Sequence, residues 1–164
     1  PFMILLVCVD DDLGMAFNHR RQSMDRALRD RLRTVCAGKD LFLSPYSMKQ
    51  FEKDQAGTDL SMEAPDSAAT ASSDTASTTL PVRFHADDSY LSQAGDGDFC
   101  FVETDDVLPL ESQAEAMILY RWNRHYPSDL TFRIPLAGHG WRLTAVTEFP
   151  GFSHERITEE VYKK

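Results

Sequence analysis

The feature that most constrains the fold is an apolar segment near the start of the chain that is followed at once by three aspartates. Met3–Val9 is apolar without alternation, which is the pattern of a strand covered on both faces in the middle of a sheet. Residues 10–18 predict a polar loop around Gly14, and a second apolar strand is predicted at residues 39–43. The first strand is therefore expected to be central in its sheet.

An Arg-rich helix is predicted between these two strands. Ser23 is a suitable N-cap, and the helix should run to about Cys36 and end at Gly38. A strand, a helix and a second strand in this order imply a right-handed crossover and a parallel pair.

The rest of the chain predicts further strands, with one segment of different composition. Pro45 should open a short helix through Phe51, whereas residues 54–79 are rich in Ser, Ala, Thr, Asp and Gly and predict a flexible insertion. We expect one domain over residues 3–164, of class α/β. Further strands are predicted at residues 80–84, 99–102, 117–122, 130–134, 141–149 and 157–162, the last ones as an antiparallel hairpin.

Composition excludes several functions. The formal net charge of −9 argues against general binding of nucleic acid or anionic membranes, which requires a basic surface. The three cysteines are widely spaced, without a CxxC pair, and indicate reduced thiols in a cytoplasmic protein. No His, Cys or carboxylate spacing typical of a metal site occurs, so we expect no bound metal.

Several segments, taken in order, resemble dihydrofolate reductase. Gly14 and Met15 resemble the mobile active-site loop of that family, and residues 39–43 resemble the strand that enters the cofactor site. The C-terminal segments match in residue type and spacing, namely residues 128–132, 141–143, 148–149, 153–154 and 160–162. The resemblance implies a three-layer α/β fold with a mostly parallel central sheet and a C-terminal antiparallel hairpin.

The resemblance also implies site residues, and here the sequence departs from the family pattern. Asp25 falls closest to the acid that positions the pterin substrate; the alternative is an ordinary first-turn Asp paired with Arg29. Of the family's cofactor motif before the second helix, Ser47 alone keeps a hydroxyl. Glu103 and Thr104 occupy the positions of the two glycines that approach the cofactor pyrophosphate. We therefore expect no ordinary NADPH site.

The Arg-rich segment predicts a local anion site in an acidic protein. Arg20, Arg21 and Ser23 precede the predicted helix, and with Met15 and Tyr46 they would line a pocket for a small anionic ligand. The alternative is a solvated helix face whose arginines are balanced by neighbouring aspartates.

Two acidic clusters and one aromatic cluster carry weaker hypotheses. The aspartates at residues 10–12 are expected to form a solvated turn rather than a metal site. Glu103, Asp105 and Asp106 could hold a cation, or they could simply enrich a helix start in acids. Tyr120 and Trp122 lie two residues apart, so strand alternation places them on one face, in the core rather than on a stacking surface.

The favoured functional interpretation is a non-reductase protein that binds a small molecule or has a regulatory role. The first alternative is a reductase of dihydrofolate or a related pterin or flavin-like substrate with altered cofactor binding. The second is a partner-binding protein that uses the Arg-rich helix. A monomer or weak dimer is expected.

Overall fold

A computed structural model of the protein describes the backbone of residues 2–61 and 80–164, and the side chains of residues 2–54 and 80–164. Its main element is a seven-stranded sheet of order β5-β4-β6-β1-β7-β10-β9. Neighbouring strands from β5 to β7 are parallel, whereas β10 is antiparallel to both β7 and β9. The strands are β1 (Met3–Val9), β4 (Asp40–Leu43), β5 (Arg83–Ala86), β6 (Phe99–Val102), β7 (Ala114–Arg121), β9 (Arg142–Phe149) and β10 (Ile157–Lys163).

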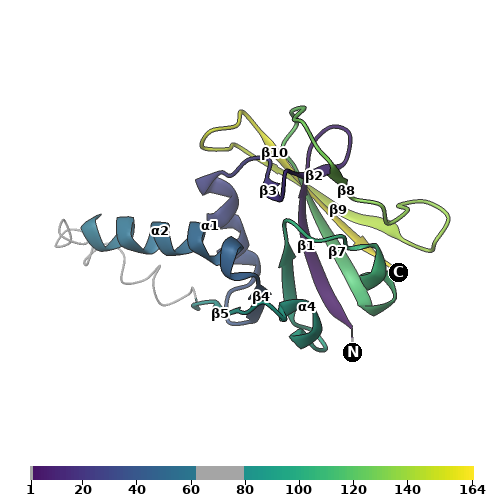
Figure 1. Ribbon diagram of the computed structural model, residues 1–164, viewed down its shortest axis with the longest axis horizontal. Helices are drawn as coiled ribbons and strands as arrows, with labels where there is room; N and C mark the ends of the chain where they lie inside the picture. Colours follow the sequence, from purple (N-terminus) through teal and green to yellow (C-terminus); the bar gives the residue numbers. More distant parts are fainter. Residues whose placement is uncertain (1, 62–79) are drawn as a thin grey trace.

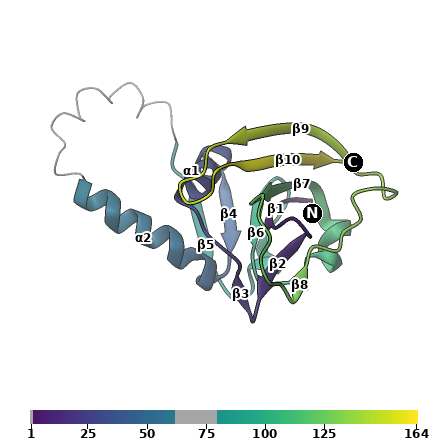
Figure 2. The ribbon, with the colours of Figure 1, turned by 90° about the horizontal axis from the view of Figure 1, so that it is seen from above.

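The central position predicted for the first strand is confirmed. β1 lies between β6 and β7, and its side chains alternate between two hydrophobic clusters on the two faces of the sheet. Helix α1 (Arg26–Val35) covers one face through Leu28 and Leu32. Tyr120 and Trp122 belong to that same cluster, as alternation predicted. Figures 1 and 2 show α1 against the sheet and β9 and β10 curving over one end of it.

The predicted polar loop at residues 10–18 is in part a strand. β2 (Gly14–Phe17) pairs with β3 (Arg20–Arg21) and with β8 (Leu130–Thr131) in a second, three-stranded sheet. Two residues with positive φ, Asn18 (54°) and His19 (62°), connect β2 to β3. Two left-handed residues form the tight turn that suits a hairpin, but sequence patterns identify it most easily when glycine occupies the second position.

Both predicted helix boundaries in the first half of the chain need correction. α1 is capped by Asp25, whose side chain accepts a hydrogen bond from the backbone N–H of Ala27, and not by Ser23. α2 (Pro45–Ser61) continues ten residues beyond Phe51 and includes the start of the predicted insertion. Glu and Lys directly after Phe51 favour helix. Residues 62–79 of that insertion lie outside the described residues.

Smaller differences concern the middle of the chain. The strand predicted at residues 80–84 is shifted to β5, and a 3-10 helix, η1 (Leu108–Gln113), precedes β7. The short helix α4 (Tyr90–Gln93) begins after Ser89. The three cysteines are buried and unpaired, as expected.

Candidate functional site

Three acidic side chains are buried where the parallel strands end or where α1 begins. Asp10 follows β1, Glu103 follows β6, and Asp25 precedes α1. Ligands of open α/β sheets usually bind outside the carboxyl ends of parallel strands, so this end of the sheet is the candidate site. Each of the three carboxylates is held by a different set of partners.

Glu103 is the centre of the first set. Its side chain is 6% exposed, and both carboxylate oxygens lie 3.1 Å from Nε of Arg21. Ser47 Oγ donates to Glu103 Oε1 at 2.7 Å, and Gln50 Nε2 donates to the same oxygen at 3.1 Å. Glu103 is thus ion-paired within the protein, and Thr104 beside it is half-buried.

Tyr46 holds the other side of the Arg21 guanidinium. The guanidinium carbon lies 4.2 Å from the centre of the Tyr46 ring, and Nη2 donates to the Tyr46 carbonyl at 3.2 Å. The backbone N–H of Arg21 donates to the Tyr46 hydroxyl at 3.1 Å. The structure therefore brings together four of the predicted residues: Arg21, Tyr46, Ser47 and Glu103.

Asp25 is the centre of the second set. It is 2% exposed and accepts hydrogen bonds from the backbone N–H groups of Phe152, Ser153 and His154, at 2.8–3.1 Å. Burial opposes its ionisation, but these bonds and the contact with His154 outweigh burial and lower the pKa of Asp25 to about 2. The predicted alternative pairing with Arg29 is wrong, because Arg29 pairs with Asp54.

His154 extends this second set toward Ser23. Its Nδ1 lies 2.9 Å from Asp25 Oδ2, and its Nε2 lies 3.1 Å from Ser23 Oγ and 2.9 Å from the Tyr126 hydroxyl. The imidazole is stacked on the Trp122 ring, with centroids 4.5 Å apart and 23° between planes. Both ring nitrogens of His154 therefore have hydrogen-bond partners that hold the ring in place.

Asp10 is the centre of the third set. It accepts hydrogen bonds from the backbone N–H groups of Asp12, Gly14 and Tyr126 and from Gln22 Nε2, at 2.7–3.1 Å. Burial acts against ionisation, but these hydrogen bonds dominate and lower the pKa of Asp10. Asp10 is therefore a buried structural carboxylate and not part of a solvated turn. The two aspartates that follow it are exposed, as predicted.

A cavity of about 290 Å³ lies beside the Asp10 and Glu103 networks. Gln22 spans its base, donating to Asp10 and to the carbonyl of Pro127, while its own Oε1 is buried without a partner among the described residues. Arg20 is exposed at the cavity and has no carboxylate partner in the part of the chain that the structure describes. The lining residues are Phe17, Asn18, Arg20, Arg21, Gln22, Tyr126 and Pro127.

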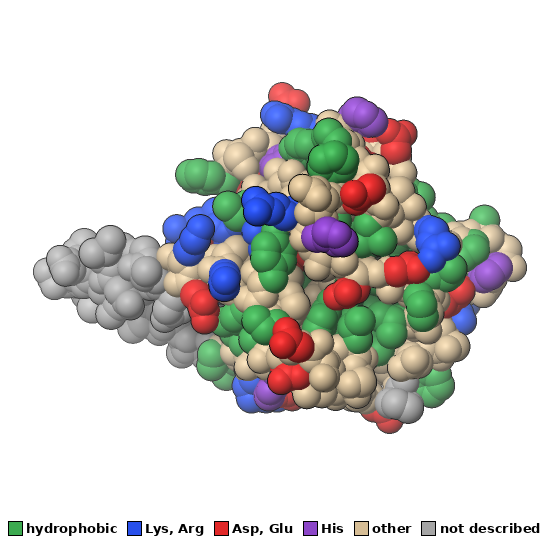
Figure 3. Space-filling view, viewed as in Figure 1, with side chains coloured by type: hydrophobic (Ala, Val, Ile, Leu, Met, Phe, Trp, Pro, Cys, Tyr) green, Lys and Arg blue, Asp and Glu red, His purple; other side chains and the backbone are tan. Residues whose placement is uncertain are grey.

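Other predicted residues lie outside this cavity. Met15 is buried in the hydrophobic core, and Ser23 borders the cavity without lining it. The arginines of α1 are largely paired: Arg31 forms two bonds to Glu159, and Arg33 reaches Asp54. In Figure 3 several basic side chains gather over the region of α1 and β3, and other basic and acidic side chains are scattered over the rest of this face.

The acidic cluster at residues 103–106 does not converge on one point. Asp105 accepts a hydrogen bond from the Tyr90 hydroxyl at 2.5 Å, and Asp106 pairs with Arg133. Within residues 2–54 and 80–164, no three His, Cys, Asp or Glu side chains are arranged to hold a metal ion. The cation-site hypothesis for this cluster is therefore wrong.

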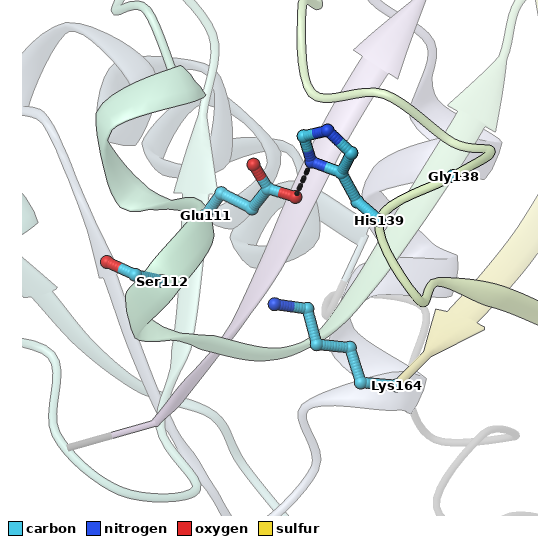
Figure 4. Close-up of a pocket in the computed structure, with 5 residues that line it drawn as sticks. All are labelled: Glu111, Ser112, Gly138, His139 and Lys164. Atoms are coloured by element: carbon cyan, nitrogen blue, oxygen red, sulfur yellow. Dashed lines mark hydrogen bonds and ion pairs between the residues drawn. The ribbon is translucent and has the colours of Figure 1, made fainter.

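A second, larger hollow of about 490 Å³ lies at the other end of the sheet, beside η1 and the end of β10 (Figure 4). Glu111 and Lys164 turn their charged ends toward the same space, and His139 Nδ1 lies 3.1 Å from Glu111 Oε2. The same oxygen accepts a bond from Trp141 Nε1 at 2.9 Å. His139 and Trp141 are both hydrogen-bonded to Glu111, and the three residues lie at the opposite end of β7 from the three buried acids.

Sequence reasoning missed several contributors to the site, among them Asn18, Gln22, Gln50, Tyr126 and His154. The partners of His154 are about 130 positions away in the chain, Asp25 at a separation of 129 and Ser23 at 131. No local pattern connects positions so far apart. For Gln22, its place between Arg21 and Ser23 was the available signal.

No helix in the described part of the chain is long and apolar enough to cross a membrane. No model of a known protein family matches the sequence, and no curated protein matches it. Among solved structures, the chain is similar to a dihydrofolate reductase from Enterococcus faecalis complexed with NADP(H) and RAB-propyl. The TM-score is 0.56 at 9% sequence identity, over 99% of this chain and 95% of that one. The chain therefore has a dihydrofolate reductase-like α/β fold.

Proposed function

We propose that this protein uses its dihydrofolate reductase-like fold to bind a small anionic ligand and is not a standard NADPH-dependent reductase. The observation that carries the proposal is Arg20, an exposed arginine that has no carboxylate partner within residues 2–54 and 80–164 and lines a cavity together with Arg21 and Gln22. A guanidinium fork binds carboxylate or phosphate in a bidentate manner.

The size of the cavity restricts the ligand. About 290 Å³ is at the lower end of the range for small-molecule sites, which is roughly 300–1,000 Å³. This volume suits a compact acid of a few carbon atoms or an inorganic oxyanion, and it is too small for a dinucleotide. Asn18 supplies an exposed amide at the cavity rim, which adds a neutral donor and acceptor next to Arg20.

The Glu103 network supports the second part of the proposal. A pyrophosphate at the end of β6 would lie against a buried carboxylate, where two unit charges about 4 Å apart repel by about 4 kcal/mol at an effective dielectric constant of 20. Moving Arg21 toward the phosphate would leave Glu103 buried without its cation, which costs several kcal/mol. Either route disfavours the nucleotide.

Thermal unfolding in the presence of inorganic phosphate, succinate and NADPH, each in a separate titration, tests the proposal. A ligand at 100 times its dissociation constant stabilises the folded state by about 2.7 kcal/mol, which raises Tm by roughly 5–10 °C in a chain of this size. We expect phosphate or succinate to raise Tm and NADPH to leave it unchanged.

Arg20→Ala should weaken anion binding by at least about tenfold. Arg26→Ala is the matched control, because Arg26 is also exposed, loses the same charge and lies outside the cavity. Equal binding by the two variants would overturn the assignment of Arg20. NADPH stabilisation together with NADPH oxidation in the presence of dihydrofolate would favour the reductase alternative instead.

A further inference from the structure

Ser23, His154 and Asp25 are connected in the order found in serine hydrolases. Ser23 Oγ lies 3.1 Å from His154 Nε2, and His154 Nδ1 lies 2.9 Å from Asp25 Oδ2. His154 is 4% exposed and Asp25 2% exposed, whereas Ser23 is half-exposed. Hydroxyl, imidazole and carboxylate in this sequence of contacts form the arrangement that activates a serine, whatever the fold.

We infer that Ser23 is the nucleophile of an acyl-transfer site, with His154 as its general base and Asp25 as the residue that positions His154. The substrate class is a small ester or thioester of an organic acid. This inference rests on the proposed anion site for the charged part of the substrate, which Arg20 would hold at the neighbouring cavity.

The tautomer of His154 follows from its contacts. The Asp25 carboxylate is ionised and only accepts hydrogen bonds, so the nitrogen that faces it, Nδ1, carries the proton. In the neutral imidazole Nε2 then carries the lone pair, 3.1 Å from Ser23 Oγ, and this is the form that acts as a general base. Asp25 cannot rotate away, because the backbone N–H groups of residues 152–154 hold its carboxylate.

Tyr126 supplies a further group at the same point. Its hydroxyl lies 2.9 Å from His154 Nε2 and 3.4 Å from Ser23 Oγ. Nε2 has one lone pair, so the two hydroxyls compete for it. When Ser23 donates to Nε2, the Tyr126 hydroxyl is free to donate to a substrate carbonyl oxygen, and Tyr126 also lines the anion cavity.

The reaction balances without a cofactor. Ser23 Oγ bonds to the substrate carbonyl carbon while its proton passes to His154 Nε2, and that proton then leaves with the alcohol or thiol as its bond to the acyl carbon breaks. Water attacks the acyl-serine, gives a proton to His154, and the free acid departs as Ser23 regains a proton. The net change is ester plus water to acid plus alcohol.

Labelling with an uncharged alkyl fluorophosphonate tests the inference on the whole chain. The Ser23 oxygen forms a bond to phosphorus, the P–F bond breaks, fluoride leaves and the serine proton goes to His154. We expect one adduct by intact mass, mapped to Ser23 and absent in Ser23→Ala. Ser92→Ala is the matched control, because its hydroxyl is exposed and donates only to the Ser89 carbonyl.

His154→Gln should slow labelling of Ser23 by at least about 100-fold. If His154→Gln does not fold, Ser23→Ala still tests the inference. Ser23→Ala should have a Tm close to that of the wild type, because Tyr126 can replace the lost hydrogen bond to His154. Absence of an adduct at Ser23, or an unchanged rate of p-nitrophenyl acetate hydrolysis in Ser23→Ala, would overturn the inference.

The charged ester mono-p-nitrophenyl succinate separates this inference from the proposed anion site. Arg20→Ala should raise KM for this ester about tenfold, whereas Arg26→Ala, whose side chain is exposed outside the cavity, should leave that KM unchanged. Equal KM values for the charged ester would refute the role of Arg20 and leave the labelling of Ser23 intact. Anion binding without labelling would refute only the acyl-transfer site.

Discussion

Replacing Asp25 by Asn should destabilise the protein by at least about 2.5 kcal/mol at neutral pH. The pKa of Asp25 is lowered from 3.8 to about 2 in the folded state. At about 1.4 kcal/mol per pH unit, this difference is the extra stabilisation of the carboxylate over its neutral form. Asn is also neutral, and its amide group would face the backbone N–H donors of Phe152 and Ser153.

The same numbers give the pH dependence. Because the folded-state pKa of Asp25 is below the unfolded-state value, its contribution is fully present above pH 3.8 and is lost as pH falls through about 2. The difference in stability between wild type and Asp25→Asn should be constant from neutral pH to about pH 5. By about pH 3 this difference in stability should have decreased by roughly half of the free energy that the ionised Asp25 carboxylate contributes.

Urea unfolding followed by tryptophan fluorescence at a series of pH values measures this difference. In a thermal melt at pH 7 the same loss should lower Tm by roughly 5–10 °C. Asp30→Asn is the control, since Asp30 is 59% exposed and its pair with Arg33 should contribute under about 0.5 kcal/mol. A wild-type stability in Asp25→Asn, or a difference that does not shrink in acid, would refute the assignment.

Three further predictions concern other buried groups. Glu103→Gln should lower the free energy of unfolding in urea by about 2–3 kcal/mol, because Arg21 loses the carboxylate with which it forms an ion pair. An unchanged urea midpoint would contradict this. Tyr120→Phe removes the buried hydroxyl that donates to Glu159 at 2.8 Å and should cost about 1–2 kcal/mol by the same measurement. Burial raises the pKa of Cys36 and Cys100 to about 12, so a disulfide reagent should modify native thiols at least about 100-fold more slowly than unfolded ones.

The sequence was sufficient to predict the central strands of the sheet, because a continuous apolar segment is a strong local signal for a buried strand. Met3–Val9 and Phe99–Val102 are continuous apolar segments, and both are fully enclosed parallel strands. Helix boundaries were less accurate, because Ser23 and Asp25 are both good N-caps. The choice between them depends on residues 152–154, which lie between β9 and β10 and are more than 120 positions from Asp25 in the sequence.

The candidate site was predicted in part for a similar reason. Arg21, Tyr46, Ser47 and Glu103 were singled out individually, but the ion pair between Arg21 and Glu103 was not predicted. An arginine 82 positions away supplies the compensating charge, and its position depends on the β2–β3 hairpin that the sequence did not reveal. Charge counts within a segment cannot anticipate pairing across the fold.

The three buried carboxylates explain why the open part of the site is so small. Asp10 and Asp25 are held mainly by backbone N–H groups, whereas Glu103 is held by side chains of β3 and α2. A cleft that would otherwise take a long ligand is thereby divided into internal networks. The open part of the site consists of the cavity beside Arg20 and the half-exposed hydroxyl of Ser23, which lie at the edge of these hydrogen-bond networks. A ligand should therefore contact these two residues directly, whereas Asp25 acts on Ser23 only through His154.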